Sequence, residues 1–88
     1  MKIKKILYTP RFVHTFKKIP VEIKNLAAAK EKIFMENPFD ARLKTHKLKG
    51  VMRDYWAFSI SYQCRIGFTF AGGDLARFHA VGTHDIYK

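Results

Sequence analysis

Residues 55–82 read YWAFSISYQCRIGFTFAGGDLARFHAVG, and this stretch decides the fold. Apolar and polar residues alternate over Tyr55–Ser61 and again over Gln63–Ala71, which is typical of strands that bury one face. Gly72-Gly73-Asp74 favours a hairpin turn, and Leu75–Gly82 is a less regular third strand. Because these connections are too short for a crossover, the stretch predicts an antiparallel meander.

The same alternation assigns side chains to the two faces of the sheet. If Ile66 and Phe68 point toward an apolar layer, Arg65 lies on the opposite, polar face. A charge flanked by apolar residues on a central strand is costly unless it has a use, so Arg65 is a candidate functional residue. Its alternative is a structural pair with a carboxylate such as Asp85. The last strand is expected to place Phe78 and Ala80 on one face and Arg77, His79 and Val81 on the other.

The residues upstream predict a strand and a first helix. Residues 2–8 fit a short strand, and Thr9 followed by Pro10 is a typical helix start. This helix should run to about Lys18.

A second helix is expected from Pro20 to about Glu36, where Asn37-Pro38 ends it. The predicted fold is therefore α+β, with an N-terminal strand and an α-hairpin packed on one face of a four- or five-stranded, mostly antiparallel sheet. The apolar stripe of the second helix comprises Ile23, Leu26, Ala27, Ile33 and Phe34.

Length and charge bound the possible functions. The 88 residues fit one domain, residues 1–88, and 48% apolar residues can form a core. The 17 Lys and Arg against 7 Asp and Glu give a net charge of +10, which indicates a polyanion or an acidic protein as partner. No stretch approaches the roughly 20 apolar residues of a membrane-spanning helix, so no membrane partner is expected. The single Cys64 excludes an internal disulfide and fits a cytoplasmic location, as a buried apolar residue.

Two histidines are the candidates for proton transfer. RNA is cut without a metal when its 2′-hydroxyl attacks the adjacent phosphate, which requires a base, an acid and positive charge. His84, just after the last strand, is the first catalytic candidate, and its alternative is an exposed tail histidine. His46 lies in a basic loop over Arg42–Lys49 and is either a base or one more surface residue. His79 fits a hydrogen-bonded histidine within the sheet.

Cations and aromatic residues complete the candidate site. The planar fork of Arg65 suits a phosphate in the transition state. Tyr87 could stack on a base or donate a proton, and Tyr55 could stack on a base, whereas Trp56 follows the apolar alternation and fits the core better. The candidate RNA-binding residues are Lys44, Lys47, Lys49, Arg53 and Tyr55.

Motifs for other chemistries are absent from the sequence. It contains no phosphate loop, no paired-cysteine zinc pattern and no dinucleotide fingerprint. We therefore expect no cofactor and no metal.

The order of these motifs resembles a known family. The segments that carry the likeness are Asn37-Pro38, His46-Lys47-Leu48-Lys49-Gly50, Tyr55-Trp56-Ala57-Phe58-Ser59-Ile60, Arg65-Ile66-Gly67-Phe68 and Val81-Gly82-Thr83-His84-Asp85-Ile86-Tyr87. Together they look like the RelE/ParE toxin superfamily, and most like its mRNA-interferase branch with RelE, YoeB and YafQ. The resemblance covers nearly the whole chain.

The resemblance implies a microbial-RNase-like fold and an enzyme, an endoribonuclease that cleaves mRNA, usually in the ribosomal A site. It also implies a small acidic antitoxin as partner, with a homodimer or a toxin–antitoxin heterotetramer as assemblies. By position, Arg65 looks like the transition-state arginine, His84 like the acid and Tyr87 like the C-terminal aromatic. His46 matches the place where some members carry a base.

The chain also departs from this family pattern. Some members carry an acidic residue or a histidine near the turn that holds Ser61-Tyr62-Gln63 here, so the base stays open between His46 and a less conventional group. ParE-like relatives share the fold without cleaving RNA, which leaves a non-enzymatic DNA gyrase inhibitor as the alternative function. A basic RNA-binding module without activity is a third reading.

Overall fold

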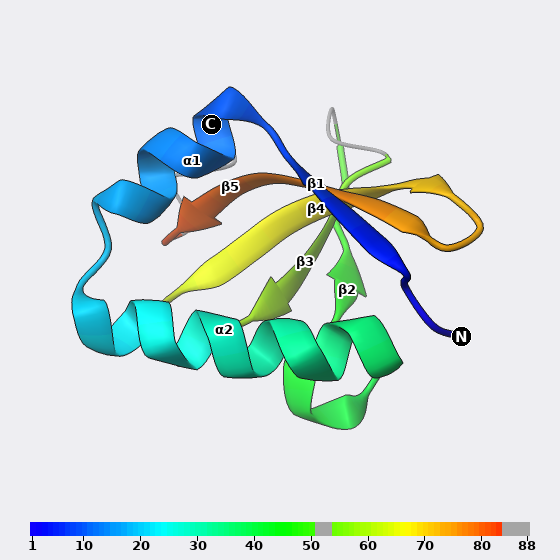
Figure 1. Cartoon of the computed structure of the whole chain (residues 1–88), viewed down its shortest axis with the longest axis horizontal. Coiled ribbons are helices and arrows are strands. Elements are labelled where there is room, and N and C mark those ends of the chain that lie inside the picture. The colour runs from blue at the N-terminus through cyan, green and yellow to red at the C-terminus, as the bar shows by residue number, and fades with distance from the viewer. Residues whose placement is uncertain (51–53, 84–88) are drawn as a thin grey trace.

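The structure, a computed structural model, describes residues 1–50 and 54–83. The elements alternate little: one strand precedes the helices, and the remaining strands follow them (Figure 1). In chain order they are β1 (Lys5–Tyr8), α1 (Pro10–Lys17), α2 (Val21–Glu36), the 3-10 turn η1 (Ala41–Leu43), β2 (His46–Lys47), β3 (Trp56–Ser59), β4 (Arg65–Gly72) and β5 (Leu75–Gly82).

Within these ranges the strands form a five-stranded sheet in the order β1-β5-β4-β3-β2. The meander of β2 to β5 is antiparallel throughout, whereas β1 pairs parallel to β5. The parallel pair is possible because the helices and the other strands separate β1 from β5 along the chain. The α+β fold with two helices and a mostly antiparallel sheet is therefore confirmed.

Both helices cover the same face of the sheet. The ring of Phe34, on α2, is fully buried and lies 5.0 Å from Phe58, 4.9 Å from Phe68 and 5.3 Å from Phe78 between ring centroids. Phe12, on α1, lies 5.5 Å from the same Phe78 ring. These rings form the centre of the core, and no helix of residues 1–50 and 54–83 covers the opposite face of the sheet.

Helix α1 begins as expected and also completes the edge of the sheet. Thr9 caps it, because its Oγ1 accepts the Phe12 N–H at 3.1 Å. The pairing of β1 with β5 stops at Phe78, and beyond it Thr15 Oγ1 accepts the N–H of Val81 at 3.0 Å. Buried backbone donors need a partner, so α1 continues the hydrogen bonding of β5 where β1 ends.

Three expectations about elements were wrong. The loop predicted over residues 42–49 contains the short strand β2, which extends the sheet by pairing with β3. Strands β3 and β4 are shorter than expected at their shared turn, because the N–H of Ile60 donates to the carbonyl of Cys64 at 2.8 Å and closes it. Leu26 is 43% exposed instead of buried. Each residue turns an α-helix by about 100°, so Leu26 points away from the side of α2 that carries Ala27 and Phe34.

A β-bulge at His79 overturns the expected faces at the end of β5. Gly67 pairs with Ala80, but the next residue, Phe68, pairs with Phe78. The extra residue reverses the alternation, so Val81 joins the core cluster under the helices, whereas Ala80, also buried, lies on the opposite face with Gly67. The prediction for these two residues was wrong because a regular period of two cannot anticipate an inserted residue.

No helix in the described ranges is long and apolar enough to cross a membrane.

Candidate functional site

Arg65 is the first residue of the central strand β4. It pairs with Ser59 on β3 and with Gly82 on β5, and its side chain is half-buried. Its neighbour Ile66 points into the core, so Arg65 belongs to the face without helices, as predicted. The chain leaves β5 beside Arg65, two residues before His84 in the sequence.

Arg65 lines a polar groove of about 260 Å³ at this end of the sheet. We call it the cationic groove, because Arg65 shares it with three further cations, Lys30, Arg42 and Lys44. Its remaining lining residues are Ser59, Ile60, Ser61 and Tyr62.

Two of these cations are held by backbone or side-chain partners. Arg42 donates from Nε and Nη2 to the two carboxylate oxygens of Asp40, both at 2.9 Å. The hydrogen bonds from Arg42 lower the pKa of Asp40 to about 2. Lys30 donates from Nζ to the carbonyl of Arg42 at 3.3 Å, which ties α2 to η1.

Sequence reasoning missed Lys30 as a member of this group. Ala27, Lys30 and Phe34 are spaced three and four apart, so they lie on one side of α2. The sequence therefore contained a signal for Lys30, because a lysine on the side of α2 that faces the sheet is unusual.

Because successive residues of a strand point to opposite faces, β2 places His46 and Lys47 on different faces of the sheet. His46 pairs with Ala57 and so shares the sheet face of Ser59 and Arg65, with its Nδ1 3.1 Å from the carbonyl of Lys44. Because β2 and β4 are two strand spacings apart, the backbones of His46 and Arg65 are separated by roughly 10 Å across the sheet. They are also offset along the strands by two residues, or roughly 7 Å, because His46 pairs with Ala57 and Arg65 with Ser59. Lys47 pairs with Trp56 and lies on the other face, with Nζ 5.9 Å from the centroid of the indole ring.

The aromatic residues at the start of β3, Trp56 and the preceding Tyr55, also point to opposite faces. Trp56 is half-buried and packs against the core, as expected. The Tyr55 ring packs against the imidazole of His79 in a tilted arrangement, with centroids 4.7 Å apart. One face of Tyr55 is therefore covered by protein.

His79 is hydrogen-bonded at both ring nitrogens, which confirms its assignment as a sheet histidine. Its Nε2 lies 2.8 Å from Thr69 Oγ1, and its Nδ1 lies 3.3 Å from the Tyr55 hydroxyl. Burial lowers its pKa, and the charges of Arg77 and Arg11 lower it further.

The remaining candidates fall into three groups. Lys44 and Lys49 are exposed, and Lys44 adopts a left-handed backbone with φ of 52° at the end of η1. Cys64 is buried, and burial raises the pKa of its thiol, as expected for a core cysteine. Three candidates lie outside the described residues: Arg53, His84 and Tyr87.

Across residues 1–50 and 54–83, no three His, Cys, Asp or Glu side chains come together in a way that could hold a metal ion.

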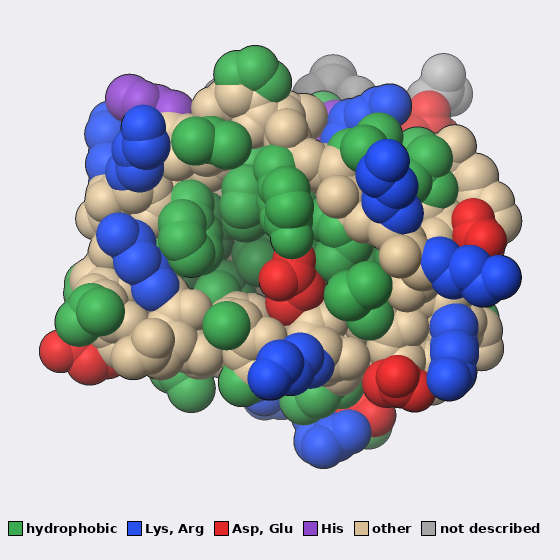
Figure 2. All heavy atoms as spheres, viewed as in Figure 1, with side chains coloured by type: hydrophobic (Ala, Val, Ile, Leu, Met, Phe, Trp, Pro, Cys, Tyr) green, Lys and Arg blue, Asp and Glu red, His purple; other side chains and the backbone are tan. Residues whose placement is uncertain are grey.

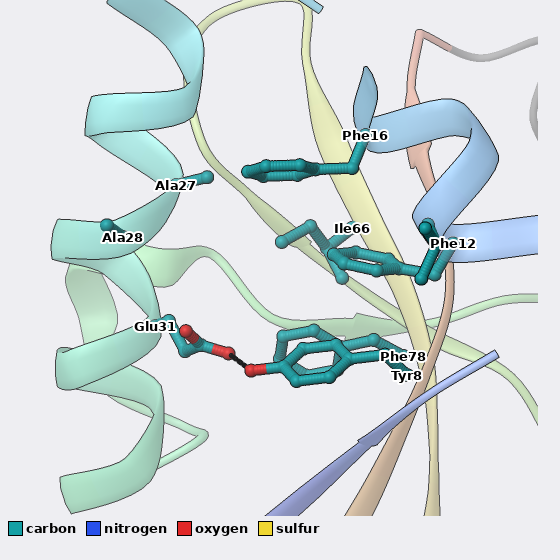
Figure 3. Close-up of a pocket in the computed structure, with 9 residues that line it drawn as sticks. Tyr8, Phe12, Phe16, Ala27, Ala28, Glu31, Ile66 and Phe78 are labelled. Carbon is teal, nitrogen blue, oxygen red and sulfur yellow. Dashed lines mark hydrogen bonds between the residues drawn. The ribbon is translucent and has the colours of Figure 1, made fainter. Parts of the chain in front are cut away.

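A second hollow, which sequence reasoning did not anticipate, lies between the helices. This hairpin groove has a volume of about 320 Å³ and is almost entirely apolar, with Phe12 and Phe16 on one side and Ala27 and Ala28 on the other (Figure 3). Figure 2 shows the apolar side chains gathered in a hollow with basic residues around it. The other residues that line the groove are Tyr8, Val13, Glu31, Ile66 and Phe78.

The polar group of the hairpin groove is the carboxylate of Glu31. The Tyr8 hydroxyl donates a hydrogen bond to it from across the groove (Figure 3). Burial, this hydrogen bond and the carboxylate charge all raise the pKa of Tyr8.

Comparison with known proteins supports the fold. No protein-family model matches the chain, and no curated protein sequence matches it. The YoeB/ParE toxin from Agrobacterium tumefaciens has a similar structure, with a TM-score of 0.78 at 19% identity over 91% of this chain and 98% of the toxin. The E. coli DinJ-YafQ toxin–antitoxin complex matches with a TM-score of 0.76 at 19% identity over 98% and 97% of the two chains.

The YoeB-YefM complex from Staphylococcus aureus matches with a TM-score of 0.75 at 16% identity over 96% of this chain and 99% of its own. Likenesses at such low identity establish a shared fold. The expected fold, that of the YoeB and YafQ toxins, is confirmed.

Proposed function

We propose that this chain is the toxin of a type II toxin–antitoxin system, a cytoplasmic endoribonuclease that cleaves mRNA in the ribosomal A site without a metal. The observation that carries the proposal is Arg65, half-buried on a polar sheet face and beside a groove lined by three more cations. The fold, which matches YoeB and YafQ toxins over nearly the whole chain, supports the same reading. Because a fold alone does not imply a function, the proposed activity depends mainly on the residues of this site.

The proposed reaction assigns one task to each candidate. The 2′-oxygen of the RNA attacks the adjacent phosphorus while His46 accepts its proton. Arg65 compensates the charge of the pentavalent transition state, and His84 donates a proton to the departing 5′-oxygen. The bond to the 5′-oxygen breaks, which leaves a 2′,3′-cyclic phosphate and a new 5′-hydroxyl. Tyr87 and Tyr55 would contact bases.

The separation of His46 from Arg65 is consistent with these roles. The general base that acts at a phosphate held by Arg65 has to come from another strand of the sheet. His46, on β2, belongs to the same sheet face as Arg65. Lys47, by contrast, lies on the opposite face, so we assign it and Lys49 to attraction of RNA rather than to the scissile bond.

For the antitoxin we propose docking in the hairpin groove. Large apolar patches on a protein surface mark interaction sites, and two residues that line this groove, Val13 at 44% and Tyr8 at 50% exposure, are open to solvent. At the margin, Lys24 lies over the ring of Phe16, with Nζ 5.6 Å from its centroid. An apolar anchor with acidic flanks, from a small acidic protein, fits both features and the net charge of +10.

The test is primer extension on a reporter mRNA after brief induction of the protein. We expect new cuts within translated codons in the wild type and none in His84→Ala or Arg65→Ala, with circular dichroism to show that both variants fold. Growth arrest with intact mRNA and damaged DNA would instead support the gyrase inhibitor. No arrest and no cuts would leave a binding module.

A further inference from the structure

The cationic groove gathers more positive charge than one scissile phosphate requires. Lys30 comes from α2, Arg42 from η1, Lys44 from the residue after it, and Arg65 from β4. Among the residues that the structure describes, no carboxylate lines the groove, and Asp40 pairs with Arg42 alone of its cations. Like charges that converge from separate elements repel one another, and a bound anion removes that cost.

Two of the cations, Arg42 and Lys30, are already held in place without a bound anion. The backbone N–H of Arg42 and two of its guanidinium nitrogens all bond to Asp40, and Lys30 is tied to the Arg42 carbonyl. Side chains held in this way lose little conformational freedom when an anion binds. Ser59 and Ser61 add hydroxyl groups to the same lining.

An exposed aromatic ring stands at the same groove. Tyr62 lines it and is 94% exposed, in the turn between β3 and β4. A ring with this exposure contributes little to the core, whereas a nucleobase stacks on such a ring whatever its sequence.

We propose that Lys30, Arg42, Lys44 and Tyr62 form a nucleotide subsite for the RNA strand, separate from the cut. The three cations hold a phosphodiester next to the one at Arg65, and Tyr62 stacks on the base attached to it. The subsite rests on the proposed function for its ligand, and it governs how tightly RNA binds rather than the rate of the chemical step.

The experiment measures binding of an all-2′-O-methyl RNA octamer, which cannot be cut, by fluorescence anisotropy over a series of salt concentrations. A Lys30→Gln and Lys44→Gln double variant should bind at least about tenfold more weakly at low salt, and its slope of log K against log salt should fall by about 1.4. Tyr62→Ala should weaken binding by about five- to hundredfold and leave the slope unchanged.

Two matched controls come from the same elements. Lys32 is an exposed lysine of α2 that does not line the groove, and Gln63 is the exposed neighbour of Tyr62. Lys32→Gln and Gln63→Ala should bind like the wild type or nearly so. The subsite is wrong if the groove variants behave like these controls, or if the wild type fails to bind the octamer.

Cleavage by the same variants separates this proposal from the proposed function. For a nuclease, the groove variants should raise KM and leave kcat within about twofold. Suppose that the groove variants lose octamer binding but the wild type cuts no mRNA. This result would support the subsite and contradict the proposed ribonuclease activity. If instead the wild type cuts mRNA and the groove variants bind and cut normally, the ribonuclease activity would be supported and the subsite contradicted.

Discussion

The imidazole of His79 lies against the ring of Tyr55, with its Nδ1 3.3 Å from the Tyr55 hydroxyl and the ring centroids 4.7 Å apart. Thr69 contacts the other ring nitrogen, so His79 on β5 links β4 to the residue that directly precedes β3, on the face without helices. The β-bulge that inserts His79 into β5 makes this contact possible.

The lowered pKa of His79 predicts a loss of stability in acid. The unfolded chain binds the proton more readily than the folded one, so the free energy of unfolding should fall as the pH drops below about 6.5. The effect of one proton is at most about 1.4 kcal/mol per pH unit, and partial exposure reduces it. Urea denaturation at a series of pH values measures it.

His79→Gln serves as the control, since its amide does not titrate. It should flatten the pH dependence between about pH 7 and 5 relative to the wild type. Parallel curves for the two proteins would mean that another group carries the acid sensitivity.

Arg65 should not be replaceable by lysine in RNA cleavage. Arg65→Ala should lower the cleavage rate by about 100-fold or more, because a preorganised charge at the transition state is lost. Arg65→Lys should recover little of it, because an ammonium group cannot bond two phosphate oxygens as a planar fork does. Single-turnover cleavage in translation extracts gives the rates, and full activity in Arg65→Lys would contradict the assigned role.

The contact between α1 and β5 should depend on one hydroxyl group. Thr15→Val keeps the shape of the side chain but leaves the buried N–H of Val81 without its acceptor, which should cost about 1–3 kcal/mol of unfolding free energy. Thr15→Ser keeps the hydroxyl and should cost much less. Urea denaturation of both variants decides the matter, and equal stabilities would argue against this hydrogen bond.

Two neighbouring alanines allow a test of antitoxin docking. Ala28 lines the hairpin groove, whereas Ala29 is exposed on α2 and does not line it. Ala28→Trp should fill the groove and weaken binding of the proposed antitoxin by tenfold or more, and Ala29→Trp should not. Calorimetric titration measures both, and equal affinities would place the antitoxin elsewhere.

The order of elements was readable from the sequence because local signals control it. Thr9-Pro10 starts α1, Asn37-Pro38 follows α2, and Gly73-Asp74 separates β4 from β5, each by short-range backbone preferences. The face of Arg65 also followed from alternation, since a regular strand points successive side chains to opposite sides.

Residue pairs from separate elements were decided by the tertiary structure alone. The spacing of Lys30 from Ala27 and Phe34 places it on the sheet side of α2, but it does not show that Lys30 shares a groove with Arg65. The hydrogen bond of Tyr8 to Glu31 across the hairpin groove has no local signal in the sequence either. The bulge at His79 likewise depends on how β5 registers against β4. Local preferences act over a few residues, whereas these contacts exist only once packing of the helices on the sheet has brought distant residues together.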